Sequence, residues 1–137
     1  MGAASIDLVR ALIASTAGEL AGAVHHETLL ARIHEYARQH LRDPALGPDQ
    51  IAAVHAMSRR QLFALFARSG ASLEQVIITR RLDAAYEELG LPGARHKTIA
   101  AVAAEWGFRD PAHFSRRFKD AFGMTPGERR AAATARP

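Results

Sequence analysis

The side chains best placed to do chemistry in this sequence lie on one face of a predicted helix over residues 111–122. With 3.6 residues per turn, one face is apolar and consists of Phe114, Phe118, Ala121 and Phe122. The opposite face consists of Ala112, Ser115, Arg116 and Lys119. Arg116 points almost directly away from the apolar face. Such an outer face is suited to hydrogen bonding with base edges and to contact with phosphates.

A tight break and a new helix start precede this cationic helix. A short apolar helix is predicted from Ile99, and Gly107 ends it because glycine readily adopts the left-handed conformation. Asp110 then supplies an N-cap and Pro111 a favoured first-turn residue, so the next helix begins only a few residues later. This order of elements is the pattern of a helix-turn-helix.

The same order of elements occurs twice in the chain. The letters IAAV stand at residues 51–54 and again at 99–102. After each copy come a break, a cationic helix, a glycine and a capping box that begins at Ser72 or Thr125. The first cationic helix also begins with a capping box, at Ser58, and its core candidates are Leu62, Leu65 and Phe66. Its predicted outward residues are Arg60, Ala64, Ala67 and Arg68.

The elements that must position these faces are all predicted to be helices, because no segment alternates with period two for long enough to be a strand. A linker helix from Ser72 to about Leu89 is about 18 residues, roughly 27 Å, long. We expect an all-α tandem helix-turn-helix domain of about seven helices over residues 27–133. Its parts are a first unit at 27–71, the linker helix at 72–90 and a second unit at 97–133.

An extra N-terminal helix is expected within residues 1–26. An apolar stripe predicts a helix over residues 5–17 that ends at Gly18. A separate helix is predicted over residues 27–41. In the helix that follows Pro48, Ile51 and Val54 are predicted to face inward. The N-terminal helix is either a connector to a regulatory domain or an oligomer contact, or it is a helix packed on the main domain or a frayed leader.

Two cationic helices joined by a linker helix of this length fit the geometry of duplex DNA. A major groove admits one α-helix, and successive major grooves on one side of B-DNA lie about 34 Å apart. Two recognition helices held near that spacing would let a monomer bind a DNA site that has two different halves and a fixed direction. Contacts between cations and phosphates release counterions, so affinity is expected to fall steeply with salt.

Composition excludes several other classes of protein. The 137 residues carry a formal net charge of +4 and no Cys, which excludes disulfides, thiolate metal sites and cysteine catalysis and fits a reducing compartment, the cytosol. No apolar run approaches the ~20 residues of a membrane span. His25 and His26 have no second ligand pair at helical spacing, so neither a metal nor a cofactor is expected. No Ser, His and acid set supports an enzyme.

The segment GFRDPAHFSRRFKDAFGMTP, from Gly107 to Pro126, resembles the signature of the AraC/XylS family of bacterial transcription regulators. SRRQLFALFARSGAS followed by RRLDAAYEELG resembles that family's first reader and linker helix, and the resemblance covers about residues 27–130. It implies a domain that contacts two adjacent major grooves of promoter DNA, commonly as an activator that contacts RNA polymerase. The base-reading residues it implies are Arg60, Phe63, Ala64, Pro111, Ala112, Ser115 and Arg116. The phosphate-contacting candidates are Arg59, Arg109, Lys119 and Thr125.

The chain departs from the family pattern in two respects. Ala64 stands where many relatives carry a long polar or cationic side chain, so the first unit is expected to discriminate bases weakly, through Arg60 and contact of Phe63 with a thymine methyl. Members usually carry a separate effector-binding domain, so this chain is either part of a longer regulator or a stand-alone one. An all-α protein-interaction module or an RNA binder that uses the same basic face would share the composition, but neither explains a duplicated cationic helix.

Overall fold

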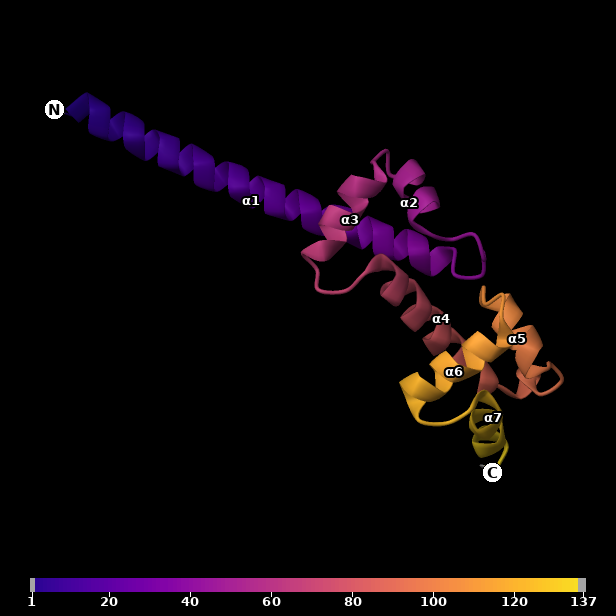
Figure 1. The fold of residues 1–137 in the computed structure, drawn as a ribbon. Coiled ribbons are helices and arrows are strands. Elements are labelled where there is room, and N and C mark those ends of the chain that lie inside the picture. Colours follow the sequence, from indigo (N-terminus) through magenta and orange to yellow (C-terminus); the bar gives the residue numbers. More distant parts are fainter. Residues whose placement is uncertain (1, 136–137) are drawn as a thin grey trace. The chain divides into compact units, whose positions relative to one another are not determined.

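The computed structural model describes residues 2–135, and their side chains from residue 5 onwards, as helices joined by short turns (Figure 1). No strand occurs among these residues, which confirms the all-α prediction. The chain divides into two compact units, Met1–Glu35 and Tyr36–Pro137. Each unit is described by itself. Within the described residues, no helix combines the length and the apolarity that crossing a bilayer requires.

Helix α1 (Gly2–Gln39) is continuous, so the predicted helix end at Gly18 is wrong. Gly18 and Gly22 both lie inside the helix, and an added Cβ at either position would meet nothing within 4 Å. A glycine costs a helix about 1 kcal/mol relative to alanine, which is too little to stop it when strong helix formers surround it. The surrounding alanines are Ala14, Ala17, Ala21 and Ala23.

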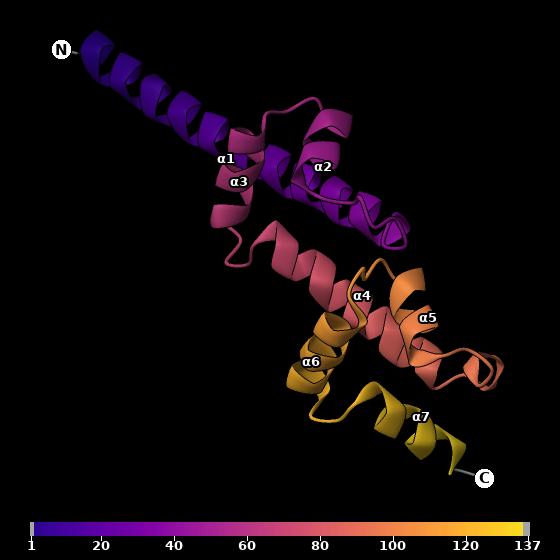
Figure 2. The same cartoon turned by 45° about the vertical axis from the view of Figure 1, so that its right-hand side comes forward.

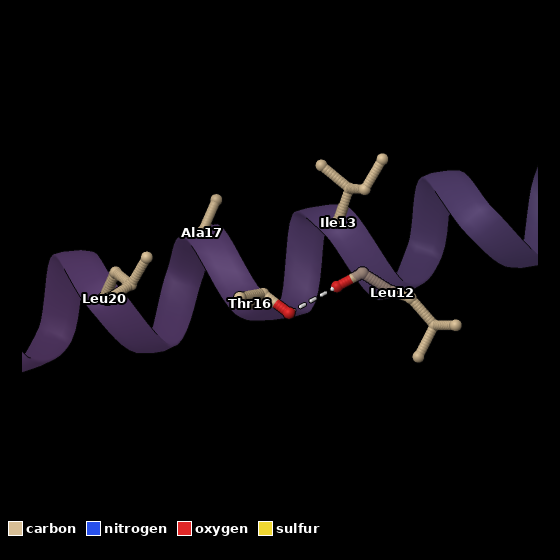
Figure 3. Close-up of a pocket in the computed structure, with 5 residues that line it drawn as sticks. All are labelled: Leu12, Ile13, Thr16, Ala17 and Leu20. Carbon is tan, nitrogen blue, oxygen red and sulfur yellow. Dashed lines mark hydrogen bonds between the residues drawn. The ribbon is translucent and has the colours of Figure 1, made fainter.

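The predicted apolar stripe of the first unit is present and lies at the surface of α1. Figure 3 shows a shallow depression along this helix, lined by Leu12, Ile13, Thr16, Ala17 and Leu20. Thr16 Oγ1 donates a hydrogen bond to the carbonyl of Leu12 at 2.9 Å, so this hydroxyl is satisfied within the helix. Leu12, Ile13 and Leu20 are all exposed within this unit.

The second unit contains both predicted helix-turn-helix motifs. The first consists of α2 (Pro48–Val54) and α3 (Arg59–Ala67), and the second of α5 (Ile99–Glu105) and α6 (Pro111–Phe122). The linker helix α4 (Leu73–Leu89) joins them, followed by a short 3-10 turn, η1 (Pro92–Ala94), and α7 (Pro126–Thr134) ends the described chain. In Figures 1 and 2 alike, α3 lies to the left of α2 and α6 to the left of α5.

The two motifs turn in the same way between their helices. Ala56 in the first and Gly107 in the second adopt left-handed backbone conformations, with φ of +53° and +85°. In both turns the amide of the next residue donates to the carbonyl five residues back, at 3.0 Å. The internal repeat predicted from the sequence is therefore a repeat of backbone geometry.

The register of that repeat differs from the one that the IAAV letters indicated. Ile51 and Val102 each precede the left-handed residue by the same distance, and both are fully buried. The first IAAV ends α2, whereas the second begins α5. Val54, which was predicted to face inward, is 54% exposed. Burial depends on the angle of a residue around the helix relative to the turn, so identical letters at different distances from the turn face different ways.

The second motif and α4 share one apolar core. Its buried members are Leu82, Ala85, Leu89, Val102, Ala103, Phe108, Phe114 and Phe118. Phe114 and Phe118 are fully buried, as the sequence predicted, and their rings lie 5.6 Å apart. Phe66 of the first motif is buried as well. Trp106, which directly follows α5, is half-buried. Helix α4 packs against α5 and α6 through this core, and it also contacts α7.

Side-chain caps fix where the helices begin. Ser58 and Ser72 each form a complete capping box with the glutamine three residues on, as predicted. Thr98 also caps its helix through the side-chain oxygen. At Thr125 the predicted box takes a different form, because the carboxylate of Glu128 accepts a hydrogen bond from the Thr125 hydroxyl. The backbone amide of Glu128 donates to the same hydroxyl.

Candidate nucleic-acid interface

Helix α6 presents the predicted outer face to solvent. Its exposed members are Pro111, Ala112 and Arg116, and Ser115 is half-buried. The inner face is held by Phe114 and Phe118, which have no exposed surface. Because these two rings fix the rotation of the helix about its axis, the opposite side chains are forced outward.

The start of α6 is fixed by Asp110. Its Oδ1 accepts a hydrogen bond from the backbone amide of Ala112 at 3.0 Å, and Pro111 occupies the first turn. Gly123, with φ of +72°, ends the helix. The first turns of a recognition helix are the part that reaches base edges. Ala112, Ser115 and Arg116 lie in these turns.

Helix α3 presents a second outer face, made by Arg60, Phe63 and Ala64. Phe63 is 46% exposed, so half of its surface remains available for an apolar contact. The Arg59 guanidinium lies 5.6 Å from the centroid of this ring. Arg59 Nε is also 3.2 Å from Oδ1 of Asp49 in α2, but both side chains are largely exposed. Exposed ion pairs contribute little, so a phosphate could replace Asp49 as the partner of Arg59.

The predicted DNA-contacting side chains differ in whether they already have hydrogen-bond or ion-pair partners within the chain. Within the described part of the chain, no residue forms an ion pair or a side-chain hydrogen bond with the exposed cations Arg60, Arg109, Arg116 and Lys119. The Thr125 hydroxyl, by contrast, already accepts from the amide of Glu128 and donates to its carboxylate. The structure therefore leaves the cations available and engages the threonine in capping.

Other basic residues have structural roles that the sequence did not reveal. The Arg129 guanidinium lies 3.9 Å from the ring centroid of Tyr86, and its Nε donates to the Tyr86 carbonyl at 3.2 Å. Arg130 donates to the carbonyl of Lys97. The two arginines thus attach α7 to the linker helix α4 and to the segment before α5, so net charge alone overstates the cations available to a polyanion.

Lys97, just before α5, lies between a carboxylate of the linker helix α4 and one of α5. Its Nζ is 2.9 Å from both Glu88 Oε1 and Glu105 Oε2, and hydrogen bonds to Glu105 and Glu88 raise the pKa of the lysine. Burial would raise the pKa of Glu88, but hydrogen bonds from Lys97 and Trp106 outweigh it, so the net shift is downward. The lysine neutralises one of the two carboxylate charges, and this network lies apart from the predicted base-reading residues in the sequence.

The histidine pair considered in the sequence does not form part of a metal cluster in the structure. The rings of His25 and His26 lie 6.3 Å apart on α1. Among the described residues, no group of three potential metal-ligating side chains is found.

Known proteins are similar to this chain over the residues that form both motifs. A family model described as a helix-turn-helix domain matches residues 51–132, which include both motifs and the linker helix. The transcriptional activator NphR of a Rhodococcus species is 33% identical over 120 residues, which cover 88% of this chain and 34% of that protein. The chain spans about a third of the length of the curated relatives it matches.

Solved structures resemble the chain over most of their own length. A probable AraC family transcriptional regulator from Rhodopseudomonas palustris superposes with a TM-score of 0.70 at 30% identity, covering 80% of this chain and 99% of that one. The DNA-binding domain of AdpA, a global transcriptional factor solved in complex with a target DNA, gives a TM-score of 0.66 at 29% identity. That match covers 77% of this chain and 93% of the other.

Proposed function

This chain belongs to the AraC/XylS family of helix-turn-helix regulators, and we propose that it binds double-stranded DNA as a sequence-specific regulator of transcription. In this proposal the tandem domain over residues 27–133 places α3 and α6 in two adjacent major grooves. Arg60, Phe63 and Ala64 face bases from the first helix. Pro111, Ala112, Ser115 and Arg116 face bases from the second.

The observation that carries the proposal is the duplicated motif with a free cationic face on each copy. The turns share a left-handed residue, Ala56 or Gly107, and the cationic helix begins three residues later in the first motif and four residues later in the second. Arg60 on α3 and Arg116 on α6 are exposed and unpaired among the described residues. An isolated arginine on such a face is the residue type that most often recognises guanine in the major groove.

The test is selection of bound duplexes from a random pool, followed by binding assays on the selected site. We expect two enriched blocks about 10–10.5 base pairs apart, centre to centre, because each block occupies one major groove. Affinity for a duplex should fall by orders of magnitude between about 50 and 200 mM salt. Equal affinity for the duplex, its separate strands and an RNA of the same sequence would contradict the proposal and favour an RNA-binding role for the basic face.

The relatives suggest how binding is used. NphR is named a transcriptional activator, and on that analogy we place this chain at a promoter as an activator that contacts RNA polymerase. An effector would bind a separate domain, with α1 as the connector. Such a regulator works on the bacterial nucleoid, in the cytoplasm, and its activity is binding rather than catalysis. Transcription from a promoter that carries the selected site, with and without the chain, distinguishes activation from repression.

A further inference from the structure

Arg81, in the middle of the linker helix, is a buried cation. It is only 8% exposed, and burying a guanidinium is costly unless its donors are satisfied. Its Nε donates to the carbonyl of Leu41 at 2.9 Å and its Nη2 donates to the carbonyl of Asp43 at 2.7 Å. Burial lowers the pKa of Arg81, while the nearby Asp43 charge opposes that shift. Arg81 therefore joins α4 to residues 41–43, the segment that leads into the first motif.

The same guanidinium lies against the turn of the second motif. A Cβ built on Gly107 would lie 2.7 Å from Cζ of Arg81 and 2.9 Å from Nε and Nη2. These distances are shorter than normal van der Waals contacts, so a residue with a Cβ would overlap the guanidinium. The close approach of the turn backbone to Arg81 therefore requires glycine at position 107. One side chain thus contacts both helix-turn-helix motifs or the segments attached to them.

A second contact joins the same two segments. The Arg42 guanidinium carbon lies 4.3 Å from the ring centroid of Trp106, within the range of a cation–π interaction. Trp106 is in turn held by α4, because its Nε1 donates to Oε2 of Glu88 at 2.6 Å. We call residues 41–43, Arg81 and residues 106–107 the junction.

We propose that Arg81 is a positioning residue that locks the two motifs against each other at the junction and thereby sets the half-site spacing that the chain accepts on DNA. The inference rests on the proposed function for its effect on DNA, but its structural part does not. Helix α4 follows α3 after the turn at Gly70, and Leu73 and Ile77 at its N-terminal end are buried outside the core of the second motif. Apolar packing at one end of α4 does not fix the rotation of the first motif about that helix. The directional bonds from Arg81 to residues 41–43 add an attachment at the middle of α4, where the second motif also contacts it, and this second attachment restricts rotation.

Restricted rotation between the two motifs limits the half-site spacings that the chain can accept on DNA. Inserting one base pair moves a half-site by about 3.4 Å and rotates it by about 35° around the duplex axis. A rigid junction cannot follow both changes, so a shifted site should be rejected. A loosened junction should tolerate the shift, at the expense of affinity for the preferred site.

The structural part is tested without DNA. The chain contains no Cys, so spin labels can be placed at two introduced cysteines on exposed residues of α3 and α6, Ala67→Cys and Asp120→Cys. We expect one narrow distance distribution in the parent and a distribution at least twice as broad after Arg81→Met. The matched control is Arg80→Met, a half-buried arginine on the same helix, which should keep the parental distribution. A parental distribution in Arg81→Met would overturn the proposal.

The DNA part compares the selected site, the same site with one base pair inserted between its halves, and a duplex with only the α6 half-site. The parent should prefer the selected site over the inserted one by roughly tenfold or more. Arg81→Met should reduce this preference several-fold and leave affinity for the single half-site unchanged. An equal loss on all three duplexes would mean a general loss of folded protein and would refute positioning. A parent that binds no duplex specifically would instead refute the proposed function.

Two milder variants keep the test decisive if Arg81→Met does not fold. Arg81→Lys keeps the charge but lacks the planar fork that reaches two carbonyls. Arg42→Ala removes the exposed partner of Trp106 and leaves the buried bonds in place. Both should broaden the label distances and weaken the spacing preference, and Arg81→Lys should do so more strongly. Parental behaviour of both variants in both measurements would overturn the proposal.

Discussion

Ala56 and Gly107 occupy the same position in the two helix-turn-helix turns, yet only one of them is suited to it. Both residues are left-handed, with φ of +53° and +85°. A residue with a Cβ is disfavoured in this conformation by roughly 1–2 kcal/mol, whereas glycine is not. The first motif therefore contains backbone strain that the second avoids.

Replacing Ala56 with glycine should stabilise the chain. Relief of the left-handed strain exceeds the entropy that glycine adds to the unfolded state, for a net gain of about 0.5–1 kcal/mol. The midpoint of urea unfolding measures it. Ala53→Gly, at an exposed position inside α2, should instead lose about 0.5–1 kcal/mol. A loss in both variants would contradict the assigned strain.

Gly107→Ala should be strongly destabilising because two costs combine. The added Cβ would sit in a left-handed conformation and would overlap the Arg81 guanidinium. Backbone strain and overpacking together amount to about 3 kcal/mol. Gly70→Ala is the matched control, since Gly70 has nearly the same φ, +83°, with nothing within 4 Å of an added Cβ. Its loss should be only about 1 kcal/mol, and equal losses in urea unfolding would disprove the contact.

Arg116→Ala should weaken binding to the selected duplex by ~1–3 kcal/mol and relax the preference at one base pair. The reason is loss of a hydrogen-bonded base contact from the outer face of α6. Because Arg116 is exposed and makes no internal bond among the described residues, the unfolding temperature should not change. Titration of the selected duplex and of single-base variants measures both effects. An unchanged preference at every base pair would rule out the base-reading role.

Lys119→Ala should weaken binding to all duplexes by a similar factor. A phosphate contact carries no sequence information, so the ranking of sites should be preserved. Loss of one contact should reduce the slope of log affinity against log salt by about one. A salt titration on a specific and on a random duplex measures this, with Arg116→Ala as the contrasting variant. A changed ranking of sites would reassign Lys119 to base recognition.

Glu88→Gln should reduce the loss of stability in acid. The pKa of Glu88 is lowered in the folded chain by the hydrogen bonds from Lys97 and Trp106, which outweigh its burial. The carboxylate therefore contributes stability above its ordinary pKa, and that stability is lost as the pH falls through the lowered folded value. Urea unfolding between about pH 6 and pH 3 should show a smaller decline in the variant. Glu87→Gln, at the exposed neighbour, should decline like the parent.

Much of the fold follows from local sequence rules. The capping boxes at Ser58 and Ser72 and the N-cap at Asp110 were predictable because each depends on residues within one helical turn. The burial of Phe114 and Phe118 was predictable because their spacing matches the helical repeat. The same spacing placed Arg116 outside. Whether these outward residues read bases stays a prediction.

The rest depends on contacts between distant parts of the chain. Arg81 directly follows Arg80 on α4 and gave no sign of burial, because its partners are carbonyls 38 and 40 residues away. Gly18 was read as a helix end, but glycine tolerates a helix when no tight turn demands its freedom. Val54 was predicted to face inward together with Ile51 on the same helix, but it is exposed. Its distance from the turn at Ala56 decides this.

The division of each cationic helix into a packed face and a free face has an evolutionary consequence. Residues such as Ala64 and Arg116 contribute nothing to the interior, so selection for a folded scaffold does not constrain them. Under the proposed function, single codon changes at these positions would retarget the regulator to a new promoter while the architecture is inherited intact. Paralogues could diverge in the genes they control without first becoming more or less stable.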